Sequence, residues 1–237
     1  MTSQIEIKNV TFQYPGAEHP VLNNINLSIE KGDFIAILGG NGSGKSTMCK
    51  LLNGLIPHYY VGDMSGEVTV KGYKTTEYKV ADLSKHVGYV YQDFDNQIVS
   101  PRVLEDASFA PLHYGLPDFR ERGLEALKLV GLEEQKDAFI WQLSGGQKHL
   151  LALASVLSLN PEIIIIDEPV AQLDPHHAKD IYDILTELNE VHNKTIIVIE
   201  HHTEFVASYA KKVVLMDQGT IHFSLPVTEA LNQVDTL

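Results

Sequence analysis

The feature that most constrains this chain is a glycine-rich stretch, GGNGSGKST, which runs from Gly39 to Thr47. It fits the phosphate-binding pattern G-x-x-x-x-G-K-[ST]. The apolar segment Phe34 to Leu38 precedes it and is typical of a buried strand, and Met48 to Leu52 predicts the start of a helix. Glycines let successive backbone N–H groups point into one concavity, and the helix directs its positive end there. The order strand, loop, helix therefore predicts a phosphate site in an α/β fold.

Two side chains of this stretch add chemistry to the backbone cradle. Lys45 can reach the β- and γ-phosphates of a nucleotide, and the Ser46 hydroxyl can ligate magnesium. The residues expected to bind the nucleotide here are Gly39, Asn41, Gly42, Ser43, Gly44, Lys45, Ser46 and Thr47. The alternative is a glycine-rich turn that binds nothing, and the strand and helix on either side disfavour it.

Composition excludes several classes of protein. The net charge is −13, from 18 basic and 31 acidic residues, which argues against broad nucleic-acid binding because that needs a basic face. It leaves ATP open, since a local site supplies its own positive field. The single cysteine, Cys49, excludes an internal disulfide and a multi-cysteine metal site. No run of about eighteen apolar residues is present that would span a membrane.

The first part of the chain predicts a small antiparallel sheet. Residues 5–10 and 24–29 alternate between apolar and polar, as half-buried strands do, and feed the strand that ends at Leu38. Residues 56–66 are interpreted as an irregular insertion, after which residues 67–72 resume the alternation. Residues 87–91 predict another strand, which ends at Gln92.

The strand signal disappears between residues 93 and 141. Leu124, Leu127 and Val130 are spaced as on one face of a helix. We therefore predict one domain over residues 1–237, with a nucleotide-binding α/β core at 1–92 and 142–237 and a helical subdomain at 93–141.

Regular elements return after residue 142. A long apolar helix is expected to run to Leu159, and Ile163 to Ile166 is typical of a parallel strand that is covered on both faces. An amphipathic helix and a second buried strand, residues 195–199, follow. Residues 213–216 and 220–223 predict a closing hairpin.

Polar residues follow the buried strands at the edge where α/β proteins bind ligands. Asp167 can hold a cation beside Ser46, and Glu168 is placed to orient or deprotonate an attacking water. His201 follows the next strand and could donate to a γ-phosphate. Each of these residues alone fits an ordinary loop, so the prediction rests on their convergence with the phosphate loop.

A second anion site is predicted where Ser144, Gly145 and Gly146 open a helix. One chain has no obvious use for two such sites facing one nucleotide. A dimer does, if the second site of each copy closes on the phosphates held by the other.

Along essentially its full length, the chain resembles the ATP-binding subunits of ABC transporters. The matching motifs are Walker A at Gly39 to Thr47, the Q-loop Gln92, the signature Leu143 to Gln147, Walker B Ile163 to Asp167 with Glu168, the D-loop Leu173-Asp174, and the switch His201. The resemblance implies an α/β P-loop NTPase with a RecA-like core, an N-terminal antiparallel β subdomain and an inserted α-helical subdomain. It also implies ATP hydrolysis with ATP and Mg²⁺, and a second ABC ATPase subunit as partner, in either a homodimer or a heterodimer.

The resemblance assigns a role to each matching residue. Position alone marks Tyr14 as an ordinary strand-end aromatic, whereas the family implies that it stacks on adenine. Ser144, Gly145, Gly146 and Gln147 would bind ATP held by the partner subunit, and Asp174 would lie at the dimer seam. The implied catalytic residues are Glu168, His201, Gln92 and Lys45. The implied magnesium ligands are Ser46, Gln92 and Asp167.

A finer resemblance is to the A component of energy-coupling-factor transporters, the ABC importers of vitamins and transition metals. It is carried by Asp95 to Pro101, Val103 to Asp106, Phe109, and Asn53 to His58. In that family the region forms a groove for coupling helices of a membrane T component, while a separate S component binds the cargo. The resemblance implies uptake of a vitamin, vitamin precursor or transition metal, at the cytoplasmic face of the membrane. The alternative is the solvated surface of a helical lobe, in an ABC ATPase of another class.

The sequence departs from the family at three places. Lys148-His149-Leu150 stands where a glutamine and an arginine are usual, Ala171 to Asp174 where a serine and a glycine are commoner, and Glu200 where a threonine is usual. None removes a group that contacts phosphate or water. These departures leave a second hypothesis, in which the chain hydrolyses ATP poorly and regulates a sister ABC subunit. An ABC protein acting on DNA or ribosomes is disfavoured by the acidity.

Overall fold

The computed structural model describes residues 3–170 and 175–234. Its strands are β1 (Ser3–Gln13), β2 (Leu22–Glu30), β3 (Phe34–Leu38), β4 (Asp63–Val70), β5 (Tyr73–Lys74), β6 (Val87–Val90), β7 (Ile163–Asp167), β8 (Thr195–Ile199), β9 (Lys212–Asp217) and β10 (Thr220–Pro226). Its helices are α1 (Lys45–Leu52), α2 (Leu55–His58), α3 (Val80–Leu83), α4 (Val103–Ala107), α5 (Phe109–His113), α6 (Phe119–Leu129), α7 (Gly145–Leu157), α8 (Pro175–Glu190), α9 (Thr203–Tyr209) and α10 (Val227–Val234). Short 3-10 helices are η1 (Phe94–Gln97), η2 (Glu133–Gln135) and η3 (Ile140–Gln142).

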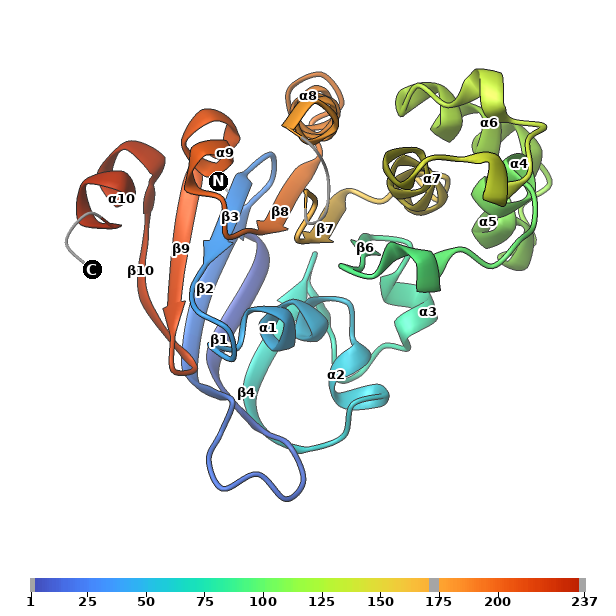
Figure 1. Cartoon of the computed structure of the whole chain (residues 1–237). Coiled ribbons are helices and arrows are strands. Elements are labelled where there is room, and N and C mark those ends of the chain that lie inside the picture. The colour runs from blue at the N-terminus through green and yellow to red at the C-terminus, as the bar shows by residue number, and fades with distance from the viewer. Residues whose placement is uncertain (1–2, 171–174, 235–237) are drawn as a thin grey trace.

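Two sheets organise the molecule (Figure 1). The larger is six-stranded in the order β10-β9-β3-β8-β7-β6, with parallel pairing except at the β9–β10 hairpin. The smaller is four-stranded and antiparallel in the order β2-β1-β4-β5. This arrangement confirms the predicted fold class, including the N-terminal antiparallel sheet and the closing hairpin.

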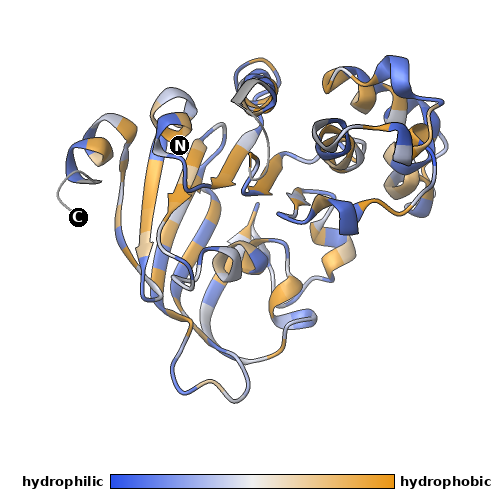
Figure 2. Ribbon diagram, in the orientation of Figure 1, coloured by the Kyte–Doolittle hydropathy of each residue, from blue (hydrophilic) through white to orange (hydrophobic). Residues whose placement is uncertain are grey.

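The strands β3, β7 and β8 at the centre of the six-stranded sheet are buried on both faces, which is why they are rich in isoleucine (Figure 2). In β7, Ile164 and Ile166 pack with α7 and α8, whereas Ile163 and Ile165 pack with α1 and the smaller sheet. Because side chains alternate along a strand, each central strand contributes to two separate hydrophobic clusters. A charged residue inside these strands would therefore be buried, and the polar residues follow where the strands end.

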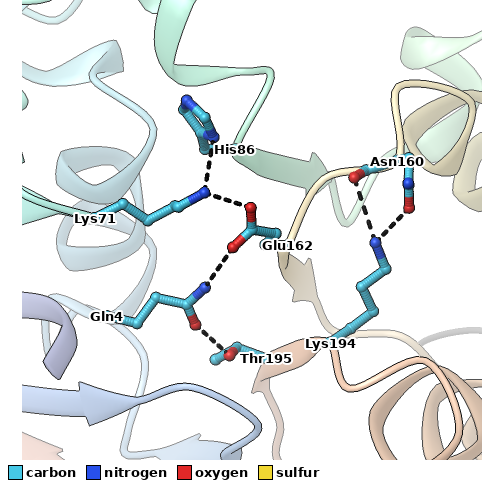
Figure 3. Close-up of polar contacts among 7 residues, drawn as sticks. All are labelled: Gln4, Lys71, His86, Asn160, Glu162, Lys194 and Thr195. Atoms are coloured by element: carbon cyan, nitrogen blue, oxygen red, sulfur yellow. Dashed lines mark hydrogen bonds and ion pairs between the residues drawn. The ribbon is translucent and has the colours of Figure 1, made fainter. Parts of the chain in front are cut away.

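A polar network joins the two sheets (Figure 3). Lys71, in the β4–β5 turn, forms an ion pair with Glu162 just before β7. Gln4 of β1 donates to the other oxygen of Glu162 at 3.4 Å and accepts from the hydroxyl of Thr195, the first residue of β8. The hydrogen bond from Lys71 is the main cause that lowers the pKa of Glu162. These contacts tie the sheets together where β7 and β8 begin, the opposite end of these strands from the predicted phosphate edge.

Between β6 and β7 the described residues are helical or irregular, apart from an isolated bridge between Arg102 and Phe139. The helices α4, α5 and α6 pack on one another and on α7, and they lie to one side of α8, α9 and α10 (Figure 1). The strand-free segment predicted from the sequence is thus confirmed. Its division from the core at residues 93 and 141 stays a prediction.

The interpretation of residues 56–66 as irregular is wrong in part. A single turn of helix, α2, spans Leu55–His58, and β4 begins at Asp63. Asp63, Met64 and Ser65 pair with β1 after a register shift between Lys8 and Thr11. Pairing with β1, rather than local alternation, makes this segment a strand. The helices α9 and α10 were not predicted.

His149 on α7 gives the fold a pH-dependent stability. Its ring is 2% exposed and stacks on Phe94 with the centroids 4.7 Å apart, and burial lowers its pKa to about 4. In the unfolded chain a histidine titrates near pH 6.5, so the unfolded state binds more protons between about pH 6.5 and 4. The contribution of His149 to stability is therefore complete above pH 6.5 and is lost as the pH falls toward 4.

We expect urea unfolding to show that, between pH 7 and pH 5, the free energy of unfolding of the wild-type protein falls by about 2 kcal/mol more than that of a His149→Phe variant. Phenylalanine keeps the stacking on Phe94 and removes the titration. Replacing the exposed His192 by phenylalanine is the matched control. This variant should show the same pH dependence of the free energy of unfolding as the wild type. Parallel pH dependences of the wild type and His149→Phe would contradict this account.

Candidate nucleotide site

A pocket of about 640 Å³ lies where the strands of the large sheet end. Its lining comes from five places: Val21 before β2, the loop and helix after β3, Gln92 after β6, Glu168 after β7, and His201 after β8. The lining residues are Val21, Asn41, Gly42, Ser43, Gly44, Lys45, Ser46, Thr47, Gln92, Glu168 and His201. The structure therefore brings together most of the residues predicted to form one site. Val21, which also lines it, was not predicted.

Glycine is required at two positions of the loop. Gly39 has φ +149°, and a Cβ built there would lie 2.1 Å from the carbonyl oxygen of Met216 on β9. Gly44 has φ +100°, and its Cβ would lie 2.8 Å from the carbonyl oxygen of Val21. Any side chain would push the loop away from β9 and β2. The glycines thus set the concave path that aims the first turn of α1 at the pocket.

Lys45, the first residue of α1, is only 7% exposed. Its ammonium donates hydrogen bonds to the carbonyl oxygens of Gly39 at 2.7 Å and Gly40 at 2.9 Å. Burial lowers the pKa of Lys45, while the nearby charges of Glu168 and Asp167 act in the opposite direction. The loop therefore holds one cationic group against its own backbone, facing two carboxylates.

Asp167 ends β7 and is 8% exposed. The hydroxyl of Tyr89 on β6 donates a hydrogen bond to Asp167 Oδ2 at 3.1 Å. Burial, reinforced by Cys49 and Asp167, raises the pKa of Tyr89 far above its usual range, so the phenol remains a donor. Tyr89 thereby orients the carboxylate. This contact joins neighbouring strands, and no local sequence pattern announces it.

Glu168 is held by side chains from both neighbouring strand ends. Gln92 Nε2 donates to Glu168 Oε2 at 2.6 Å, and His201 Nε2 lies 3.2 Å from Glu168 Oε1. The backbone of Glu168 has φ +52°, and its N–H donates to the carbonyl of Ile199 on β8. A left-handed conformation at a non-glycine residue is uncommon and is often found at functional sites. The bond to β8 maintains it here.

Tyr14 lies beside α1 rather than in the pocket lining. Its hydroxyl is 3.3 Å from the Thr47 hydroxyl, and its ring meets Phe12 edge-on with the centroids 4.9 Å apart. These two contacts fix the ring next to the helix that follows the loop.

Ser144 caps the start of α7. Its hydroxyl accepts from the N–H of Gln147 at 3.2 Å, and Gln147 Oε1 accepts from the N–H of Ser144 at 2.9 Å. This reciprocal capping box fixes the helix tip. Ser144, Gly145, Gly146 and Gln147 do not line the pocket that contains Lys45. Asp174, predicted to contact the nucleotide from the dimer seam, lies outside the described residues.

The donor set fits magnesium. Within residues 3–170 and 175–234 there is no group of three or more His, Cys, Asp or Glu side chains placed to hold a metal. Mg²⁺ instead takes oxygen ligands, commonly one or two carboxylates together with substrate phosphates. The Asp167 carboxylate, the Ser46 hydroxyl and the Gln92 amide supply such oxygens.

A buried lysine in a glycine loop between strand and helix, with carboxylates at the end of a nearby parallel strand, defines a P-loop ATP-binding domain. The ABC transporter family model matches residues 22–171. An ABC transporter ATP-binding protein of Pyrococcus abyssi is 40% identical over 235 residues, which cover 98% of this chain and 84% of that protein. The chain belongs to the ABC transporter ATP-binding family, and it binds and hydrolyses ATP.

Solved structures of this family share the fold. The chain is 32% identical to cbiO1 from Clostridium perfringens, part of the ABC transporter complex cbiONQ, with a TM-score of 0.89 and coverage of 100% and 93% of the two chains. It is also 32% identical to the ATP-binding cassette MJ0796, a dimer bound to ADP and Pi, with a TM-score of 0.81 and coverage of 94% and 98%. No helix in the described part of this chain is long and apolar enough to cross a membrane.

Proposed function

We propose that this chain is the ATPase subunit of an energy-coupling-factor importer for a vitamin, vitamin precursor or transition metal, working at the cytoplasmic face of the membrane. The similarity to cbiO1 along the whole chain supports it. The observation that carries it is an apolar groove lined by the residues that resemble this importer class.

The groove has a volume of about 310 Å³ and lies between the core and the helices that follow β6. Leu55, Gln97, Val99, Asp106 and Phe109, which belong to the importer-like segments, contribute to its wall. Val99 is 60% exposed and Phe109 is 38% exposed, and Tyr59 nearby on the chain after α2 is 72% exposed. Exposed apolar side chains around a groove fit an amphipathic helix of a partner. We assign this groove to a coupling helix of a membrane T component, which works with an S component that binds the cargo.

The groove gives a direct test. Phe109→Asp and Val99→Asp should reduce co-purification of a membrane-spanning partner by at least about tenfold, because a carboxylate would be buried against an apolar helix. ATP binding should be unchanged, since neither residue lines the nucleotide pocket. Val191→Asp is the matched control, because Val191 is 72% exposed and lies outside the groove. Every chain retained on the purified protein is identified by mass spectrometry.

Two outcomes would refute the proposal. One is that the groove variants retain their membrane partner as well as Val191→Asp does. The other is that no chain with several membrane spans accompanies the wild-type protein.

For ATP hydrolysis, we assign charge neutralisation on the γ-phosphoryl group to Lys45 and the amides of residues 39–47. Ser46, Gln92 and Asp167 would hold Mg²⁺, which supplies further positive charge to the phosphate oxygens. The oxygen of the attacking water bonds to the γ-phosphorus as ADP leaves, and Glu168 accepts a proton from that water. Gln92 and His201, which both contact Glu168, keep its carboxylate in position. These contacts favour an active ATPase over a hydrolysis-poor regulatory partner.

The dimer proposal follows from the separation of the two anion sites. The Ser144 tip does not line the pocket of its own chain, and the positive end of the α7 dipole favours an anion there. In a twofold pair, the tip of one chain would close on ATP held by Lys45 of the other. Ser144, Gly145 and Gly146 would then contact the γ-phosphate, while Tyr14 stacks on the adenine in its own chain.

A further inference from the structure

Glu200 is a carboxylate buried directly before the switch His201, at 2% exposure. Its oxygens accept three hydrogen bonds. Oε1 accepts the backbone N–H groups of His201 at 2.8 Å and His202 at 3.0 Å, and Oε2 accepts the hydroxyl of Tyr182 at 2.7 Å. A buried carboxylate is costly unless it is hydrogen-bonded in this way. The local sequence shows only an unusual residue and gives no sign of this role.

The donor at Oε2 belongs to a rigid cluster. Tyr182 of α8 is 1% exposed, and its ring stacks on Phe205 and Tyr209 of α9, with the centroids 4.9 Å and 5.0 Å apart. The backbone N–H of Glu200 donates to the carbonyl of Ile37 on β3. Glu200 is thus fixed on one side to the sheet and on the other to the packed helices α8 and α9.

The other oxygen of Glu200, Oε1, holds the backbone of His201, the residue that carries the imidazole. The N–H of His201 itself is bonded, so only the two side-chain torsions of His201 remain to place its ring. That ring lies with Nε2 3.2 Å from Glu168 Oε1. The chain of contacts runs from α8 through Tyr182 and Glu200 to His201 and then to Glu168.

We propose that Glu200 is a positioning residue for ATP hydrolysis, which holds the His201 backbone so that the imidazole meets the Glu168 carboxylate. The proposal rests on the role assigned above to His201. Glu200 does not line the nucleotide pocket, so in this proposal it acts on catalysis only through His201. It also links the switch residue to α8, so a shift of α8 would move His201.

The test is a double-mutant cycle of turnover in the purified complex, using Glu200→Ala, His201→Ala and both together. Glu200→Ala should lower kcat by about tenfold or more and leave KM for ATP within about twofold, because only alignment is lost. In the His201→Ala background, Glu200→Ala should lower kcat by no more than about twofold. Glu200→Gln should recover most of kcat, because its amide oxygen still accepts both N–H groups.

Tyr182→Phe gives a second double-mutant cycle, because this variant keeps the stacked ring and removes only the hydroxyl that binds Glu200. The decrease in kcat caused by Tyr182→Phe should likewise vanish in the His201→Ala background. If either change slows His201→Ala by the same factor as wild type, Glu200 does not act through His201 and the proposal is overturned. A rise in KM with unchanged kcat would overturn it as well. If His201→Ala alone turns over ATP at the wild-type rate, His201 has no role in hydrolysis and the premise of the proposal fails. That single variant shows this failure, so it is distinguishable from a failure of the double-mutant cycle.

Discussion

Replacing Glu168 by glutamine is expected to slow ATP turnover by roughly 10²–10⁴-fold, the usual contribution of a general base. Glutamine has the same length and branching, so it fits the left-handed backbone at residue 168 as well as glutamate does. It can still accept from Gln92, but it cannot take a proton from water. ATP affinity should stay within about twofold, because binding rests on the residue 39–47 loop and Lys45.

Steady-state phosphate release and equilibrium binding of a fluorescent ATP analogue measure the two effects separately. Glu190→Gln, at the exposed end of α8, is the control for loss of one negative charge and should turn over like wild type. Turnover by Glu168→Gln that matches this control would show that another group activates the water.

Replacing Ser144 by aspartate should reduce turnover by roughly 10²–10³-fold, the loss expected when a donor to a charged transition state becomes a repelling anion. Aspartate is as good an N-cap as serine, so α7 should keep its start. The single chain should still bind ATP, because Ser144 does not line the pocket with Lys45.

Lys45→Ala provides the contrast to Ser144→Asp. It removes the cation inside the loop, so it should lose both ATP binding and turnover. Circular dichroism and thermal melting show that each variant is folded. Near-normal turnover in Ser144→Asp would mean that this helix tip does not face the phosphates of any subunit.

Much of the fold was predictable because its strands carry strong local signals. The isoleucine run of β7 is buried on both faces, and the convergence of Glu168 and His201 follows from parallel strands ending at one edge. The start of β4 at Asp63 was not predictable, because pairing with β1 specifies it rather than the residues themselves.

The contacts that orient the side chains of the site could not be predicted from the sequence either. Tyr89 reaches Asp167 from the neighbouring strand, and Tyr182 reaches Glu200 from a helix 18 residues earlier. Both pairs depend on packing between elements, which no local pattern encodes. The motifs therefore predicted which side chains would meet in the pocket, whereas the side chains that hold them in place required the structure.

The central claim is that two copies clasp ATP between the Lys45 loop of one and the Ser144 tip of the other. The most direct test is the mass in solution of Glu168→Gln, measured by light scattering with and without ATP and Mg²⁺. We expect the single-chain mass of 26.4 kDa without nucleotide and twice that mass with it. Adding Ser144→Asp should return the ATP-bound protein to the single-chain mass. ATP bound by a species that stays at the single-chain mass, or a doubled mass that Ser144→Asp does not disturb, would contradict the claim.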